Sequence, residues 1–235
     1  MTDRTAIDWG QPEPRAPAGR VIAGRALLAF GLPLVVVVAA LIPVGSPLLV
    51  GAGVAVYAGG VLWWVKAQGA RALRAAAAER PRSDEAARMV NLVAGLSADL
   101  GIASPEVLVS RRGGANALVC LASGPKLLLT RALLEEFTRT EQEAVAAHCL
   151  VRLRGGQVRS AQLALALGPF GASLAGPVGG FDDVAATALT RYPPALAAAI
   201  RKSDAATGRY SGLWFVGAGA PHVPGEQRAA ALADL

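Results

Sequence analysis

The stretch "AVAAHCLVRLRGG", residues 144–156, decides how the rest of the chain is interpreted. Thr140 followed by Glu143 has the spacing of a capping box, so a helix is predicted to begin near Glu141. The pair Gly155–Gly156 then ends it. The whole stretch is therefore predicted to be one apolar helix with a few polar positions.

Two of those polar positions lie one turn apart on one face. His148 and Arg152 have the i, i+4 spacing that a His-Glu-x-x-His zinc helix uses for its two metal ligands. In that pattern the residue after the first His is a Glu that activates water, whereas this chain has Cys149. The stretch thus keeps one of the three residues that the chemistry needs.

Upstream, the chain carries no charge from Ala26 to Val65, which is a membrane signal. Residues 26–43 and 48–65 each have about the length that crosses a hydrocarbon core of roughly 30 Å. The turn-forming stretch "VGSP" separates them. We therefore expect a transmembrane helical hairpin over residues 25–66.

The flanking charges predict the orientation of this hairpin. Cations precede the first span and follow the second, so both termini are expected on the cytoplasmic side, with Trp63 and Trp64 at the interface. The first span could instead be a cleaved signal peptide, but a second apolar span follows at once. The cations are Arg4, Arg15, Arg20, Arg25, Lys66, Arg71, Arg74, Arg80 and Arg82.

The net charge of +6 does not indicate a nucleic-acid partner. Residues 66–82 carry five bases and one acid, whereas 14 bases oppose 13 acids from Ser83 to the end. The basicity is thus confined to the membrane edge, where it suits an anionic leaflet. Cys120 and Cys149 lie in apolar contexts, as expected of free thiols in a reducing compartment.

After the hairpin, the pattern predicts an α+β domain, mostly helical with a small sheet. A helix over 83–102 with an N-cap at Ser83 or Asp84 is followed by short β-type runs and a further helix. The runs are "PEVLVS" (105–110), "NALVCLA" (116–122) and "KLLLT" (126–130), and the helix is "RALLEEF" (131–137). The chain then divides into a polar, Pro-rich segment 1–24, the hairpin, and a domain over 67–235.

Four ordered segments of this domain resemble the HtpX-like, CAAX-prenyl-protease-like membrane zinc metallopeptidases. The stretch from Leu127 to Leu153 is similar to the family's strand and helix leading into "AVLAHELAH", and "GGANALV" to its "PNAFA" strand. Further on, "DDVAATALTRYPPALAAAI" and "PHVPGEQRAAAL" are similar to its "EADRLAxELTGxPxALxxAL" and "THPPxxERIxxL" segments. The resemblance implies a zincin-like fold and the inner membrane of a bacterium.

The same resemblance implies a degenerate active site. His148 matches the first zinc ligand, Cys149 the catalytic Glu, and Arg152 the second ligand; the third ligand falls on Gly179 if Asp183 is the family's Asp. A guanidinium has no lone pair to offer and brings a positive charge to the metal position. We therefore expect no zinc and no other cofactor, and treat these residues as a vestigial site.

Each vestigial residue has more than one interpretation. His148 could be a partly buried, hydrogen-bonded histidine or a ligand, and Cys149 a packed thiol or a nucleophile. Arg152 could pair with an acid from the helix over 181–187 in place of the metal. His222 is most simply a remnant of "THP", and residues 160–180 are expected to lie against the domain or in the interface.

Two surfaces are candidates for partner binding. Asn116 and Ala117 lie on the strand over 116–122, which could accept an extended peptide or be an ordinary covered edge. The second span has small residues that would allow close helix packing against another integral membrane protein. These are Gly51, Gly53, Ala55, Gly59 and Gly60, with Trp63 and Trp64 as interfacial anchors.

Two classes of function follow from these observations. The first is a membrane-anchored pseudopeptidase that serves as a subunit, adaptor or scaffold for another membrane protein. The second is an active zinc metalloendopeptidase with unconventional ligands, which is the only case that requires zinc. The losses at positions 149, 152 and 179 favour the first class.

Overall fold

The computed structural model describes residues 30–40, 42–44, 46–82, 86–168, 171, 178–219 and 222–235. It has a mixed α+β fold with a small four-stranded sheet, as predicted. Several predictions concern residues outside these ranges: the 1–24 segment, the start of the first apolar span (26–29), and the N-cap at Ser83 or Asp84.

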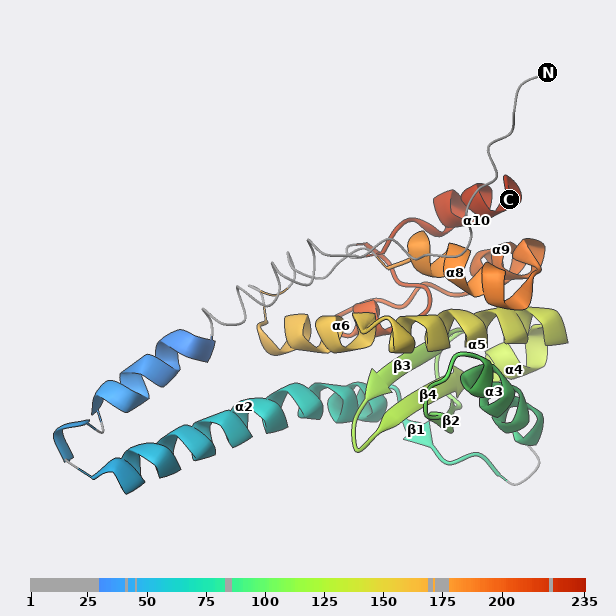
Figure 1. Ribbon diagram of the computed structural model, residues 1–235. Helices are drawn as coiled ribbons and strands as arrows, with labels where there is room; N and C mark the ends of the chain where they lie inside the picture. Colours follow the sequence, from blue (N-terminus) through green and yellow to red (C-terminus); the bar gives the residue numbers. More distant parts are fainter. Residues whose placement is uncertain are drawn as a thin grey trace, which may run out of the picture.

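One long helix projects from the body of the protein. Helix α2 (Pro47–Ala75) is the helix among the described residues that is long and apolar enough to cross a membrane. Its projecting part lies beside the shorter apolar helix Phe30–Ala40 (Figure 1). The short helix η1 (Ile42–Val44) lies between these two helices in the chain. Tyr57 Oη donates a hydrogen bond to the Phe30 carbonyl at 2.5 Å. The described residues thus support one crossing helix and not two.

The strand order of the sheet is β1-β2-β4-β3. The central pair, β2 (Glu106–Ser110) and β4 (Pro125–Thr130), is parallel. The two edge strands, β1 (Ala78–Glu79) and β3 (Ala117–Leu121), are antiparallel to their neighbours. The three longer strands confirm the predicted β-type runs, and β1 adds two residues directly after α2.

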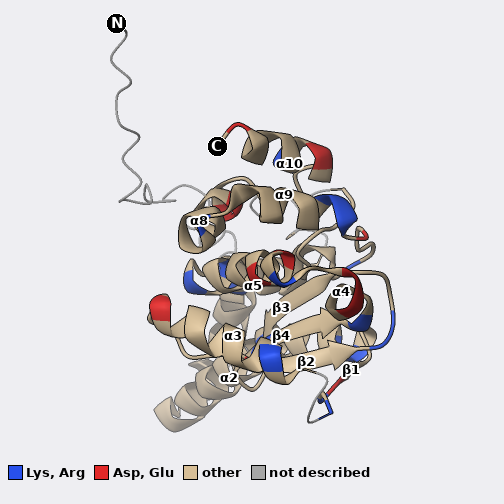
Figure 2. Cartoon of the chain, turned by 90° about the vertical axis from the view of Figure 1, so that its right-hand side faces the viewer, with Lys and Arg blue, Asp and Glu red and all other residues tan. Residues whose placement is uncertain are grey.

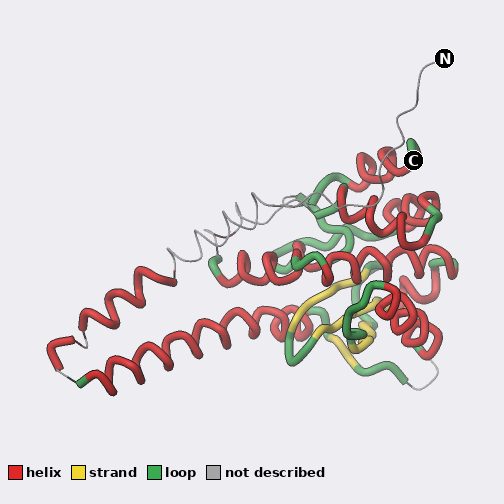
Figure 3. The backbone as a smooth tube through the Cα atoms, in the orientation of Figure 1, coloured by secondary structure: helices red, strands yellow, loops and turns green. Residues whose placement is uncertain are grey.

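Both faces of the sheet are covered, which explains why its strands are continuously apolar. Residues such as Val119 and Leu127 face the main core with α3 (Ala87–Asp99) and α5 (Arg139–Arg154). The alternate residues, such as Leu118 and Leu128, face a second cluster with Ala72 of α2. Figure 3 shows the strands lying between these groups of helices.

The remaining helices complete the body around α5. Helix α4 (Arg131–Glu136) follows β4, and α6 (Gln157–Ala166) continues from α5 towards the projecting end of the molecule (Figure 1). On the side of α5 away from the sheet lie α8 (Phe181–Thr190), α9 (Pro193–Lys202) and α10 (Gly225–Ala233); a short η2 (Ser211–Leu213) precedes the last.

The predicted start of α5 is wrong by two residues. The sequence contains two overlapping Thr-x-x-Glu spacings, and the structure uses Thr138 and Glu141. Thr138 N–H donates to Glu141 at 2.7 Å, and Lys202 Nζ of α9 donates to the same carboxylate at 2.9 Å. With Thr138 as the N-cap, the buried Glu141 carboxylate accepts both of these hydrogen bonds, so α5 begins at Arg139.

Candidate functional site

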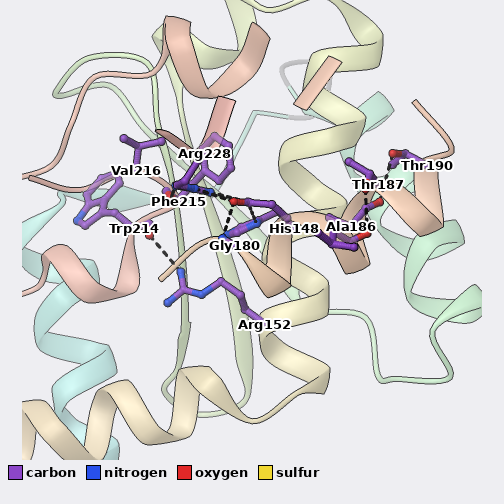
Figure 4. Close-up of polar contacts among 12 residues, drawn as sticks. His148, Arg152, Gly180, Ala186, Thr187, Thr190, Trp214, Phe215, Val216 and Arg228 are labelled. Atoms are coloured by element: carbon purple, nitrogen blue, oxygen red, sulfur yellow. Dashed lines mark hydrogen bonds and ion pairs between the residues drawn. The ribbon is translucent and has the colours of Figure 1, made fainter. Parts of the chain in front are cut away.

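The predicted vestigial site is a fully enclosed polar centre. His148 and Arg152 lie on the buried face of α5, and neither is exposed to solvent. Asp182 and Asp183 reach the same region from the first turn of α8 and are also buried. Figure 4 shows His148 beside Gly180, at the start of α8, with Phe215 and its neighbours next to them.

Asp183 is the residue to which most of the contacts lead. His148 Nδ1 lies 2.9 Å from its Oδ1 atom, although this contact is not aligned as a hydrogen bond. Gly180 N–H donates to Oδ2 at 2.8 Å, at the N-terminus of α8, where a carboxylate is favoured. The contact between His148 and Asp183 was not predicted from the sequence.

A residue that the sequence analysis did not assign completes the centre. Arg228 of α10 donates from Nε to Asp183 Oδ2 at 2.8 Å and from Nη2 to Oδ1 at 2.7 Å, a bidentate ion pair. Its Nη1 donates to the Phe215 carbonyl at 3.0 Å. Arg228 is only 2% exposed, so this pair is shielded from water.

Gly179 makes room for this arginine. A Cβ at Gly179 would lie 2.5 Å from Arg228 Nε, and the φ of +106° is one that residues with side chains rarely adopt. The position to which the resemblance transfers a third zinc ligand therefore cannot carry a side chain here. The guanidinium of Arg228 occupies that space.

The prediction for Arg152 is wrong in its partner. Its Nη1 donates to the Trp214 carbonyl at 3.1 Å and its Nη2 to the Gly212 carbonyl at 2.7 Å (Figure 4). The acid of the 181–187 helix that pairs with an arginine is Asp183, and it pairs with Arg228. Arg152 instead ties α5 to η2 and Trp214, because carbonyl oxygens there accept its hydrogen bonds.

Burial sets the ionisation of the centre. It opposes the ionisation of Asp183, but the hydrogen bonds from Arg228 and the close contact with His148 outweigh it and hold the pKa of the carboxyl well below its ordinary value. Burial lowers the pKa of His148, although Asp183 acts in the opposite direction. It also lowers the pKa of His222 to about 4, although the Ser211 carbonyl, 2.8 Å from Nε2, opposes this. Both imidazoles are thus neutral at pH 7.

The two cysteines have no access to solvent either. Burial raises the pKa of both Cys149 and Cys120 to about 12, so neither is a thiolate at ordinary pH. Cys149 packs in the main core, and Cys120 in the second cluster. Of the two interpretations of Cys149, the packed thiol agrees with this environment and the nucleophile does not.

The residues present do not fit a zinc ion. His148 Nε2 has no hydrogen-bonding partner among the described residues, so one imidazole nitrogen could serve as a ligand. Asp183, however, is held by Arg228, and Arg152 adds a second buried guanidinium. The part of the chain that the structure describes contains no group of three His, Cys, Asp or Glu residues placed to hold a metal.

The edge of β3, for which the sequence left both a peptide site and an ordinary covered edge open, is covered by the chain itself. Asn116 and Ala117 are buried, and Phe215 N–H donates to the Ala117 carbonyl at 2.7 Å. The Asn116 side-chain Nδ2 donates to the Val216 carbonyl at 2.7 Å and to the Asp204 carbonyl at 2.6 Å. Of the two alternatives for this strand, the covered edge describes the structure.

The other end of β3 is closed by a side chain of α6. Gln162 Oε1 accepts from Leu121 N–H at 2.7 Å, and Gln162 Nε2 donates to the Leu121 carbonyl at 2.7 Å. Gly69 of α2 approaches the same carbonyl so closely that a Cβ there would lie 2.1 Å from it. Helix α2 is thus packed directly against the end of this strand.

The small residues of α2 do not form one surface. At 100° per residue, Gly51, Ala55 and Gly59 share one face, whereas Gly53 and Gly60 lie on the opposite side. A Cβ at Gly51, Gly59 or Gly60 would meet nothing within 4 Å. Trp63 is 64% exposed, and Trp64 is 36% exposed.

Comparison with known proteins adds no relative. No protein-family model, no curated protein and no solved structure matches this chain. The interpretation of the site therefore depends on its own residues.

Proposed function

We propose that this chain is a membrane-anchored, catalytically inactive homologue of the HtpX-like metallopeptidases that serves as a subunit or adaptor for another membrane protein. The observation that carries the proposal is that two buried arginines lie where the resemblance to the family would put metal ligands. Arg152 stands at the position of one ligand, and Arg228 fills the space of another beside Gly179. A pair of guanidiniums repels a divalent cation.

The membrane part of the proposal is a helical hairpin in the inner membrane, with both termini in the cytoplasm. It is supported by the length and composition of α2, by the Tyr57–Phe30 contact, and by large apolar side chains left exposed on α2. Leu48, Val56 and Leu62 are 84%, 76% and 62% exposed. Side chains of this kind are expected to face lipid or another membrane helix.

The partner surface in this proposal is the face of α2 that carries Gly51, Ala55 and Gly59. It allows another helix to approach closely, because no other part of the described chain fills it. An extended peptide along 116–122 remains a prediction, and it would require Phe215 and its neighbours to leave the β3 edge.

Metal analysis of the purified full chain tests the catalytic part. We expect far less than one zinc per chain and no peptidase activity on unfolded protein substrates, with or without added zinc. Stoichiometric zinc that is lost on His148→Ala would overturn the proposal and favour the unconventional metallopeptidase.

Affinity purification in mild detergent tests the adaptor part with a matched pair of variants. Gly59→Leu should abolish recovery of a membrane protein that co-purifies stoichiometrically with the wild type, because it fills the small-residue face. Gly60→Leu adds the same side chain on the other side of α2, also into open space, and should leave recovery unchanged. Equal recovery with both variants would rule out this face.

A further inference from the structure

The end of α6 lies against α2 at one defined position along the α2 axis. Trp64 Nε1 of α2 donates to the Ala166 carbonyl of α6 at 3.1 Å. One residue earlier, the Leu165 carbonyl accepts from Arg209 Nη2 at 3.1 Å. These two contacts fix the last turn of α6 beside residues 64–68 of α2, as Figure 1 shows for the two helices.

This level corresponds to the surface of a bilayer. The uncharged stretch 47–65 of α2 is about 28 Å long at 1.5 Å per residue, close to the roughly 30 Å of a hydrocarbon core. In Figure 2 the projecting end of α2 carries no Lys, Arg, Asp or Glu colour. Lys66 is the first charge, so Trp64 and the end of α6 lie at the level of the lipid headgroups.

Two guanidiniums gather at this junction. The guanidinium carbon of Arg71 lies 4.2 Å from the centroid of the Trp64 ring, so its side chain folds back towards the membrane end of α2. Arg209 also reaches Gln68 Oε1 at 3.4 Å and is exposed. Neither α2 nor α6 contains an Asp or Glu, so these cations face no acid from either helix.

Arg209 also borders open space. It lines a cavity of about 330 Å³ between the cytoplasmic end of α2 and the 204–214 segment, with Tyr210 and Trp214 as further walls. The acid that lines this cavity, Asp204, accepts from Ala115 N–H at 2.9 Å. The guanidinium of Arg209 can therefore turn towards a headgroup without displacing packed side chains.

We propose that the junction of α2 and α6 binds the phosphate groups of anionic phospholipids through Arg71 and Arg209, with the last turn of α6 lying on the bilayer surface. The inference depends on the membrane anchorage in the proposed function and on neither the adaptor role nor the absence of zinc. Charge complementarity selects the ligand: an anionic leaflet attracts basic side chains at this depth, whereas zwitterionic lipid does not.

The test compares the thermal stability of the full chain in nanodiscs of phosphatidylcholine alone and of equal parts phosphatidylcholine and phosphatidylglycerol. A lipid that binds the folded chain preferentially raises its melting temperature. We expect a rise of several degrees for the wild type and little or none for the double variant Arg71→Gln/Arg209→Gln. The charge-retaining Arg71→Lys/Arg209→Lys should keep most of the rise.

The control is a second double variant with the same change of charge, Arg139→Gln/Arg201→Gln. Both residues are exposed and lie away from the junction, so the rise should be that of the wild type. An equal loss in both double variants would indicate a net-charge effect and overturn the site. So would a wild type that does not respond to phosphatidylglycerol, or one that responds equally to inorganic phosphate in phosphatidylcholine discs. Stoichiometric zinc would refute the proposed function and leave this result unaffected.

Discussion

The protein contains two clusters of arginines in opposite environments. Arg152 and Arg228 are buried in the body and donate their hydrogen bonds to Asp183 and to carbonyl oxygens of their own chain. Arg71 on α2 and Arg209 beside it lie at the surface, where they contact an aromatic ring, a side-chain amide and the Leu165 carbonyl. The comparison indicates that the buried pair holds helices together, whereas the surface pair is available to a partner.

The largest expected effect is the removal of the buried carboxylate. Asp183→Asn leaves Arg228 without its counter-charge in a site that excludes water, which should destabilise the fold by about 3–5 kcal/mol. At this chain length the melting temperature should fall by about 10 °C, measured by circular dichroism in mild detergent.

The matched control for that variant removes a carboxylate from the surface. Glu226 lies 3.9 Å from Arg201, and its side chain is 87% exposed. Glu226→Gln should change the free energy of unfolding by about 1 kcal/mol at most. If Asp183→Asn had an equally small effect, the buried centre would not hold the helices together.

The second-largest expected effect is a loss of folding stability on acidification. The pKa values of His148 and His222 are lowered in the folded chain, so below pH 6.5 the unfolded chain binds protons that the folded chain does not. Stability is therefore highest above pH 6.5 and falls by about 1.4 kcal/mol per pH unit for each histidine. For His222 this loss ends near pH 4, its folded pKa.

Chemical unfolding between pH 7.5 and pH 5 measures this slope. Asp183 has a lowered pKa as well, but its contribution is lost only below its unfolded value of about 3.9, outside this range. His222→Asn should remove the contribution of His222 to the pH dependence, so the free energy of unfolding should fall less steeply with decreasing pH. A stability that is flat across this range would contradict the neutral, buried imidazoles.

The contrast between the two clusters also shows what the sequence could predict. The strands β2 and β4 and the helix α4 follow from continuous apolar runs and turn residues, which act locally. The contact between His148 and Asp183 was not predicted, because the two residues lie on different helices, α5 and α8. The role of Arg228 was not predicted either, because it lies 45 residues from Asp183 and its burial depends on the missing side chain at Gly179.

Asn116 is a second residue whose environment could not be predicted from the local sequence. A polar residue at the start of an edge strand suggests an open hydrogen-bonding edge, and no local pattern reveals that residues 204 and 216 return to it. The two overlapping Thr-x-x-Glu spacings before α5 are likewise equal in sequence. They are distinguished only by Lys202, which reaches Glu141 from α9.

A substitution at a buried position of α2, next to the surface arginines, tests how tightly this helix is packed against the body. Gly69→Ala places a Cβ 2.1 Å from the Leu121 carbonyl, so α2 or β3 must shift, at about 1–3 kcal/mol. Gly95→Ala in α3 meets nothing within 4 Å and should stabilise by up to about 1 kcal/mol. Thermal unfolding of both in the same detergent checks the difference, and equal effects would exclude tight docking of α2.

The smallest expected effect separates two neighbouring tryptophans of α2. Trp64→Phe removes the hydrogen bond to the Ala166 carbonyl and weakens the contact with Arg71, which should destabilise the junction by about 1 kcal/mol. Trp63→Phe makes the same chemical change at the more exposed position and should have less effect. Hydrogen exchange of the last turn of α6 is the decisive measurement: it should accelerate in Trp64→Phe and not in Trp63→Phe, because the Trp64 indole donates to this turn. Equal exchange in the two variants would mean that α6 is kept in place by the body and not by α2.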